Sequence, residues 1–175
     1  GRLTLGVSLS MALTPLVVTL NDKCLRLGES AESPPFDSIG PQGHRVMIAG
    51  FGRFGQMIAR TLRMKKIPFT ALEASFEQVD FVRKFGNRIY YGDASRLELL
   101  RAAGADLAEI FVLAIDDVDV SVKTAEIVRK HYPHLKIYAR ARNRVHAYRL
   151  MDLGVDKVMR ETFLSSVELA RDVLI

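Results

Sequence analysis

RVMIAGFGRFG, at residues 45–55, is a short apolar strand that runs directly into the pattern G-x-G-x-x-G, and a helix-like sequence follows at residues 56–66. In that geometry Gly50 makes the tight turn, Gly52 lets the backbone approach a pyrophosphate, and Gly55 lets helix and strand pack closely. The helix directs unpaired N–H groups and the positive end of its dipole at an anion. The residues of this turn that we expect at a nucleotide are Gly50, Phe51, Gly52, Arg53, Phe54 and Gly55.

A carboxylate follows at the spacing that is typical of dinucleotide-binding proteins. The apolar run at residues 68–72 ends in Glu73, about 20 residues beyond the glycines. Glu73 can accept hydrogen bonds from ribose hydroxyls and would repel a 2′-phosphate, which favours NAD or AMP over NADP. Strand, glycines, helix, strand and acid in this order predict a nucleotide-binding Rossmann unit, and the alternative is a coincidental glycine pattern.

Apolar runs alternate with helical patterns from residue 45 onward. This alternation predicts an α/β domain with a Rossmann-like, doubly wound parallel sheet. The expected strands are residues 46–49, 69–72, 89–91, 110–115, 136–140 and 157–159. The expected helices are residues 54–64, 76–85, 96–102, 118–131, 145–153 and 162–174.

The sequence before this domain has a different composition. Residues 3–20 contain no charged side chain, and Lys23 and Arg26 follow, as at the cytoplasmic end of a membrane span. We expect residues 1–20 to be the end of a transmembrane helix; a signal peptide and a buried soluble helix are the alternatives. Residues 21–44 are rich in Gly, Pro and Ser, which predicts a linker.

The bulk composition excludes several classes of protein. The chain has 175 residues and a formal net charge of +5. Its basic residues are scattered over the expected helices without an interleaved aromatic stripe, so we expect no nucleic-acid partner. The single cysteine, Cys24, excludes an internal disulfide, and no Cys/His spacing predicts a metal site.

Acidic residues follow two further strands, and ligands of doubly wound sheets lie beyond these carboxyl ends. After the third strand, Asp93 would lie beside the adenine or cap the next helix, and Ala94 and Ser95 could offer backbone contacts. Asp116 and Asp117 end the fourth strand. We place Asp116 at the nucleotide, although capping of the following helix is the simpler role for this pair.

Three arginines, Arg140, Arg142 and Arg144, lie at the end of the fifth strand or directly after it. Their guanidinium groups would favour a carboxylate or phosphate from a ligand or partner. Only residues 141–175 remain after this strand, and they offer no Tyr-x-x-x-Lys pair and no His–carboxylate arrangement for hydride transfer. A nucleotide site without a reaction site indicates a sensor rather than an enzyme, and the alternative is a fragment of an NAD-dependent oxidoreductase.

Several strings resemble the RCK or KTN domain, the regulatory domain of bacterial potassium channels and transporters. They are residues 46–55, 91–95, 114–117 and 139–142. More specific strings, at residues 50–56, 97–104, 131–135 and 160–163, resemble the Kef family of glutathione-gated potassium efflux systems. The resemblance covers residues 45–175, and it makes residues 1–20 the end of the last transmembrane helix of a cation/proton antiporter domain.

The resemblance implies a homodimeric cytoplasmic domain at the bacterial inner membrane. Glutathione would hold the transporter closed, glutathione adducts of electrophiles would open it, and a separate pocket would hold AMP or NAD(H). Arg160 and Phe85 match positions at the family's glutathione site, and Arg60 matches a position in gating. A quinone-oxidoreductase-like ancillary subunit is the expected soluble partner. The family's C-terminal tail is absent from this chain, and the alternative is a nucleotide-sensing regulator of another potassium transporter.

Overall fold

The structure is a computed structural model that describes residues 43–84 and 89–174. The predicted end of a transmembrane helix, at residues 1–20, lies outside the described residues, as do residues 21–42 of the predicted linker and Phe85. Within the described ranges, no helix combines the length and the apolar composition that crossing a bilayer requires.

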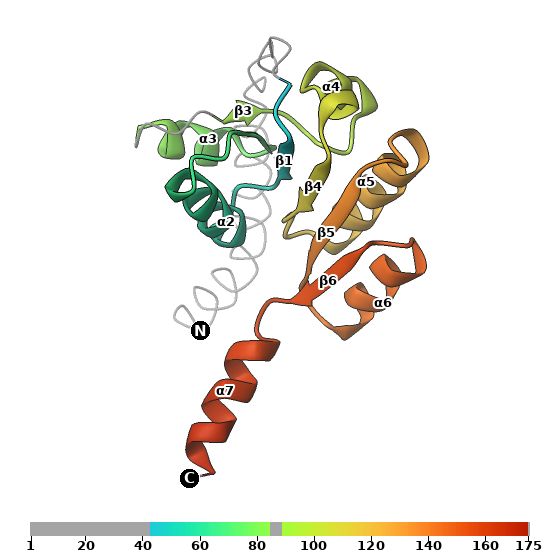
Figure 1. The fold of residues 1–175 in the computed structure, drawn as a ribbon. Helices are drawn as coiled ribbons and strands as arrows, with labels where there is room; N and C mark the ends of the chain where they lie inside the picture. The colour runs from blue at the N-terminus through green and yellow to red at the C-terminus, as the bar shows by residue number, and fades with distance from the viewer. Residues whose placement is uncertain (1–42, 85–88, 175) are drawn as a thin grey trace, which may run out of the picture. The chain divides into compact units, whose positions relative to one another are not determined.

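The centre of the domain is a six-stranded sheet with the order β3-β2-β1-β4-β5-β6 (Figure 1). All pairings are parallel, as the alternating pattern predicted. The strands are β1 (Val46–Ala49), β2 (Phe69–Glu73), β3 (Tyr90–Tyr91), β4 (Ile110–Leu113), β5 (Lys136–Ala141) and β6 (Lys157–Arg160). The chain order reverses between β1 and β4, which is where a doubly wound sheet binds its ligand.

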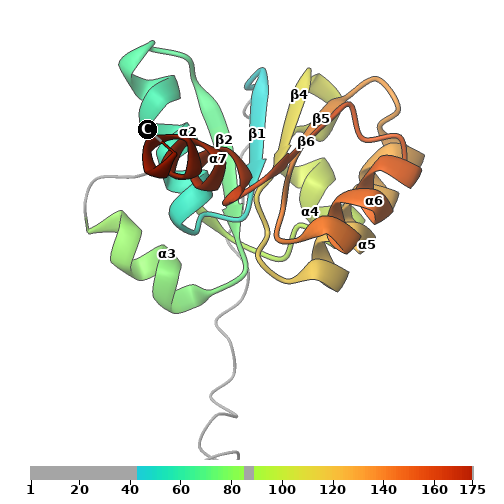
Figure 2. The ribbon, with the colours of Figure 1, turned by 90° about the horizontal axis from the view of Figure 1, so that it is seen from below.

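Helices cover both faces of the sheet (Figure 2). They are α2 (Arg53–Met64), α3 (Phe76–Arg83), α4 (Leu97–Ala102), α5 (Val118–His131), α6 (Arg144–Asp152) and α7 (Phe163–Val173). Alternate strand residues point to opposite faces. Ile48 and Val112 therefore pack with α2 and α3, whereas Met47, Ala49 and Phe111 pack with α4, α5 and α6. These two cores fix the strand ends that form the pocket described below.

Side-chain caps begin three of the helices. Ser75 accepts a hydrogen bond at the start of α3, Asp117 at the start of α5 and Asn143 at the start of α6. Such caps satisfy N–H groups that have no partner within the helix. Helix α2 begins differently: its N-cap is Gly52, and no described side chain caps it.

The predicted elements are confirmed with small shifts at their ends. Helix α3 ends at Arg83 rather than residue 85, and β5 extends to Ala141. A 3-10 helix, η1 (Ala105–Leu107), was not predicted; it follows Gly104, whose φ is +83°. None of the residues of α7 is buried, and Figure 1 shows this helix extending beyond the end of β6.

Candidate functional site

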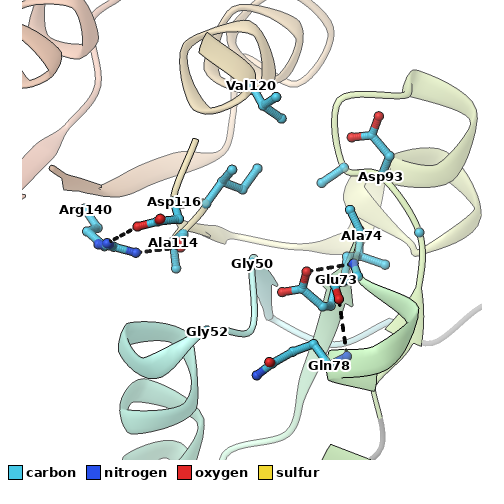
Figure 3. A pocket seen from close by; sticks show the side chains of 15 residues that line it. Gly50, Gly52, Glu73, Ala74, Gln78, Asp93, Ala114, Asp116, Val120 and Arg140 are labelled. Atoms are coloured by element: carbon cyan, nitrogen blue, oxygen red, sulfur yellow. Dashed lines mark hydrogen bonds and ion pairs between the residues drawn. The ribbon is translucent and has the colours of Figure 1, made fainter. Parts of the chain in front are cut away.

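A solvent-open cavity of about 220 Å³ lies at the carboxyl ends of β1, β2, β3 and β4 (Figure 3). It occupies the place where the strand order reverses, between β1 and β4. Its lining residues are Gly50, Gly52, Leu72, Glu73, Ala74, Ser75, Gln78, Gly92, Asp93, Ala94, Ala114, Ile115, Asp116, Val120 and Arg140.

The three glycines of the turn have three different surroundings. Gly50 has a φ of +91°, and a Cβ there would lie 2.7 Å from the backbone C of Ala114 and the N of Ile115. A Cβ on Gly55 would lie 2.2 Å from the carbonyl oxygen of Gly50. At Gly52 no described heavy atom would lie within 4 Å, and this residue lines the cavity. Gly50 and Gly55 therefore permit the turn itself, whereas Gly52 leaves room beside the N-terminus of α2.

Glu73 holds the glycine turn against β2. One carboxylate oxygen accepts the Phe51 N–H at 2.6 Å, and the other accepts the Ser75 N–H at 2.9 Å. Gln78, on α3, donates to the Phe51 carbonyl at 3.2 Å. A carboxylate accepts about four hydrogen bonds, so Glu73 keeps acceptor capacity for a hydroxyl in the cavity that it lines.

Asp93 and Ser95 form a closed turn after β3. The carboxylate of Asp93 accepts the Ser95 N–H at 2.8 Å and the Ser95 hydroxyl at 2.9 Å. Asp93 and Ala94 line the cavity, but Ser95 is buried and does not. The N-cap of α4 is Arg96, so Asp93 stabilises the turn before this helix rather than capping the helix itself.

The two carboxylates after β4 have separate roles. Asp117 accepts the N–H groups of Asp119 and Val120 and caps α5. Asp116 lines the cavity and pairs with Arg140 at 2.5 Å. The hydrogen bond from Arg140 lowers the pKa of Asp116 below its ordinary value. Burial opposes this shift, and the charges of Arg140, Arg142 and Arg53 lower the pKa further.

Arg140 is the buried cation of the site, with 6% of its side chain exposed. Its Nη2 lies 2.6 Å from a carboxylate oxygen of Glu161, and its Nε lies 3.0 Å from the same oxygen. Nη1 of Arg142 lies 3.4 Å from a carboxylate oxygen of Asp116. Nε of Arg144 donates to the Tyr148 hydroxyl at 2.8 Å. The predicted arginine cluster is therefore not one open anion site, because the guanidinium of Arg140 already pairs with the carboxylates of Asp116 and Glu161.

The remaining predicted nucleotide contacts lie around the cavity rather than in its wall. Phe51 is buried in the core beneath the turn, and Gly55 is packed on Gly50. Arg53 is exposed at the first position of α2. The ring of Phe54 lies 6.0 Å from the Arg140 guanidinium.

Two of the residues that the resemblance assigns to glutathione binding and gating, Arg160 and Arg60, do not line this cavity. Arg160 lines a second cavity of about 510 Å³ between α6, β6 and the start of α7, together with Arg144, Tyr148 and other side chains. Its guanidinium stacks on Phe163 at 4.1 Å. Arg60 is exposed on α2, and Phe85 lies outside the described residues. Arg160 and Arg60 therefore do not line a common cavity.

Sequence reasoning missed several residues of the site. Ser75, Gln78 and Val120 line the cavity from helix N-termini, where no motif marks them. It also missed His146, which is fully buried. His146 Nδ1 accepts the Arg142 N–H at 3.2 Å, so its Nε2 carries the proton and donates to the Ser121 hydroxyl at 3.2 Å. Burial lowers the pKa of His146, and the charges of Arg149 and Arg140 lower it further.

Comparison with known proteins finds one matching family and several similar solved structures. The TrkA-N domain family matches residues 46–161. The chain is similar to the Kef CTD of Shewanella denitrificans in its AMP-bound form, with 46% identity over 74% of this chain and 78% of that chain and a TM-score of 0.66.

Two further solved structures are more distant. The TrkA-N domain of inner membrane protein ybaL from Escherichia coli is 26% identical over 75% of this chain and 94% of that chain, with a TM-score of 0.63. The GsuK protein bound to ADP is 25% identical over 76% of this chain, with a TM-score of 0.64, and the match covers 34% of that chain.

Proposed function

Because this chain belongs to the TrkA-N domain family and is a regulatory RCK domain rather than an enzyme, we propose that it regulates a Kef-like potassium transporter by binding a nucleotide. The observation that carries the proposal is the cavity at the β1–β4 boundary. There an open glycine position, an uncapped helix N-terminus and the carboxylate of Glu73 face the same space. A phosphate fits the first two features and ribose hydroxyls fit the third.

AMP is the nucleotide that we propose first. It is the ligand of the Shewanella denitrificans relative, which is the more similar of the two nucleotide-bound structures described above. In our proposal the phosphate lies beside Gly52 and the N-terminus of α2, the ribose binds Glu73, and the adenine lies by Asp93 and Ala94. NAD(H) would place its adenosine half in the same way. The carboxylate of Glu73 would repel the 2′-phosphate of NADP.

Isothermal titration calorimetry of the purified domain tests this proposal. We expect AMP to bind the wild-type domain and NADP to bind it far more weakly. The substitution Glu73→Gln should lower the affinity for AMP. Glu77→Gln, on the exposed first turn of α3, makes the same change of charge outside the cavity and is the matched control. Absence of binding by AMP and by NAD(H) to the wild-type domain would refute the nucleotide site.

Gating by glutathione is the finer part of the proposal. Glutathione carries two carboxylates, which guanidinium groups bind well. The second cavity offers Arg160 and Arg144 beside the aromatic side chains of Phe163 and Tyr148. An adduct would keep the carboxylate contacts and add volume near Phe85, and Arg60 stays in the proposal as a residue that acts in gating. A ligand shifts a transporter only by binding its closed and open states differently.

The proposed system is a homodimer in the cell inner membrane, with this domain on the cytoplasmic face. Residues 1–20 would join it to a potassium/proton antiport domain. A quinone-oxidoreductase-like ancillary subunit would be the soluble partner. The support for the homodimer in this chain is the set of exposed apolar side chains on α7, which are Phe163, Leu164, Val167, Leu169 and Val173. Exposed apolar side chains that gather on one helix are typical of a surface that another protein covers.

Potassium efflux from cells that carry the full-length protein tests glutathione gating. After treatment with N-ethylmaleimide, we expect rapid potassium loss with the wild type and little loss with Arg160→Ala, while AMP affinity stays unchanged. Equal loss in both, with both proteins present in the membrane, would remove glutathione gating. The likeness to ADP-bound GsuK then favours a potassium regulator that senses nucleotide alone.

A further inference from the structure

One buried guanidinium connects the nucleotide cavity with the start of α7. Nη2 of Arg140 lies 2.5 Å from a carboxylate oxygen of Asp116 and 2.6 Å from one of Glu161. Asp116 lines the cavity, whereas Glu161 does not and lies between β6 and α7. Two carboxylates from different parts of the domain therefore share one nitrogen.

Glu161 fixes the chain at the point where α7 leaves the domain. Its N–H donates to the Ala141 carbonyl at 3.1 Å, and its carboxylate holds Arg140. The side chain of Glu161 is 27% exposed, whereas none of the residues of α7 is buried. The contacts of Glu161 are thus the last partly buried polar contacts before the helix.

The Arg140 end of this network lies on the side of the cavity where we propose the phosphate (Figure 3). Figure 3 shows Arg140 and Asp116 on one side of the glycine turn, with Glu73 and Asp93 on the other. Arg140 also lies 6.0 Å from the ring of Phe54, which is in the first turn of α2. A phosphate at this helix terminus would therefore meet the guanidinium that Glu161 partly neutralises.

We propose that Glu161 is a positioning residue of the nucleotide pocket, which acts through Arg140 and couples nucleotide binding to the start of α7. The inference rests on the proposed nucleotide site. A ligand phosphate and the Glu161 carboxylate compete for the same cation. Bound phosphate therefore weakens the contact between Arg140 and Glu161, and loss of that contact strengthens phosphate binding, because coupling between two sites is reciprocal.

Calorimetry with AMP and with adenosine tests the inference, using Glu161→Gln. Because the variant leaves more positive charge on Arg140, we expect it to bind AMP about five- to tenfold more tightly, at the lower end of the usual allosteric range. Adenosine carries no phosphate, so its affinity should not change. A purely structural role for Glu161 would instead weaken both ligands. Glu168→Gln, an exposed substitution on α7 with the same change of charge, is the matched control and should bind both ligands as the wild type does.

A second measurement uses the wild-type protein alone. AMP should speed hydrogen exchange at the amide of Glu161, which donates to the Ala141 carbonyl, whereas adenosine should not. Unchanged AMP affinity in Glu161→Gln, or slower exchange at this amide, would overturn the inference while leaving the nucleotide site intact. If the wild type binds neither ligand, the nucleotide site and the coupling both fail. If Glu161→Gln does not fold, the exchange measurement decides.

Discussion

Substituting alanine at two glycines of the same turn should separate folding from ligand binding. A Cβ on Gly55 would lie 2.2 Å from the carbonyl oxygen of Gly50, and Cβ atoms in proteins essentially never approach a non-bonded heavy atom within 3.0 Å. The obstacle is backbone, so a side-chain rotation cannot relieve it. A Cβ on Gly52 would meet no described heavy atom within 4 Å.

The size of the effect at Gly55 follows from two opposing contributions. Overpacking costs up to about 3 kcal/mol, and backbone contact places Gly55→Ala at that upper end. Alanine in place of glycine within a helix returns about 1 kcal/mol. The net loss of about 2 kcal/mol corresponds to a fall in Tm of about 5–10 °C for a domain of this size.

Gly52→Ala meets no steric obstacle among the described residues, but alanine is a poorer N-cap than glycine, so the variant should lower the free energy of unfolding by about 1 kcal/mol, less than Gly55→Ala does. Gly52→Ala should weaken AMP binding about tenfold or more, equivalent to about 1.4 kcal/mol, because the new methyl group would occupy the space that the phosphate approaches. Thermal unfolding and calorimetry on both variants test this contrast. A fully stable Gly55→Ala would refute the close approach of α2 to the turn. Wild-type AMP affinity in Gly52→Ala would refute the placement of the phosphate.

Three further predictions concern stability. The pKa of His146 is lowered by burial, so the unfolded chain binds the extra proton first and the free energy of unfolding should fall as pH drops below about 6.5. Urea titrations between pH 7 and 5 should show that the free energy of unfolding of His146→Asn depends less on pH than that of the wild type. An equal pH dependence in the two proteins would contradict this prediction. Asp156 accepts the Ile137 N–H and pairs with Arg129, each at 2.8 Å, so Asp156→Asn should lower the free energy of unfolding in urea at pH 7 by about 1–2 kcal/mol. The pKa of the Asp156 carboxyl is lowered mainly by the Ile137 hydrogen bond, so the stability difference between wild type and variant should shrink as pH falls below about 4. Equal stability of the two proteins at pH 7 would contradict this role of Asp156. Phe111→Ala should cost about 3–5 kcal/mol, because Phe111 is fully buried in the sheet, and a loss below about 1 kcal/mol would show that the core collapses around the deletion.

The sequence predicted the sheet well because local patterns and chain connectivity agree in this fold. The apolar runs, the glycines after Ala49 and the cap at Asp117 are all local signals, and each appears at the expected place. The order of β1 and β4 as neighbours follows from the way doubly wound sheets connect. Element ends shifted by one or two residues, because terminal turns depend on tertiary contacts rather than on pattern.

The site was predictable only where one strand end supplies one residue. Glu73, Asp93 and Asp116 follow strands directly and line the cavity as expected. The roles of Arg140 and Glu161 were not predictable, because their contact joins residues 21 positions apart, and it turns a supposed open cation into a buried, paired one. His146 gave no signal, because a single histidine within a helical pattern reads as an ordinary helix residue.

The exposure of α7 has a consequence for the order in which the domain loses structure. The helix has 11 residues, below the length of about 12–15 at which isolated helices become marginally stable in water. Helix α5, by contrast, buries Val122, Ala125 and Val128 in the main core. In the separated domain, α7 can therefore unwind at little cost while the rest stays folded, as an independent cooperative unit. Its helicity is then an adjustable quantity, set by whatever covers its apolar side chains.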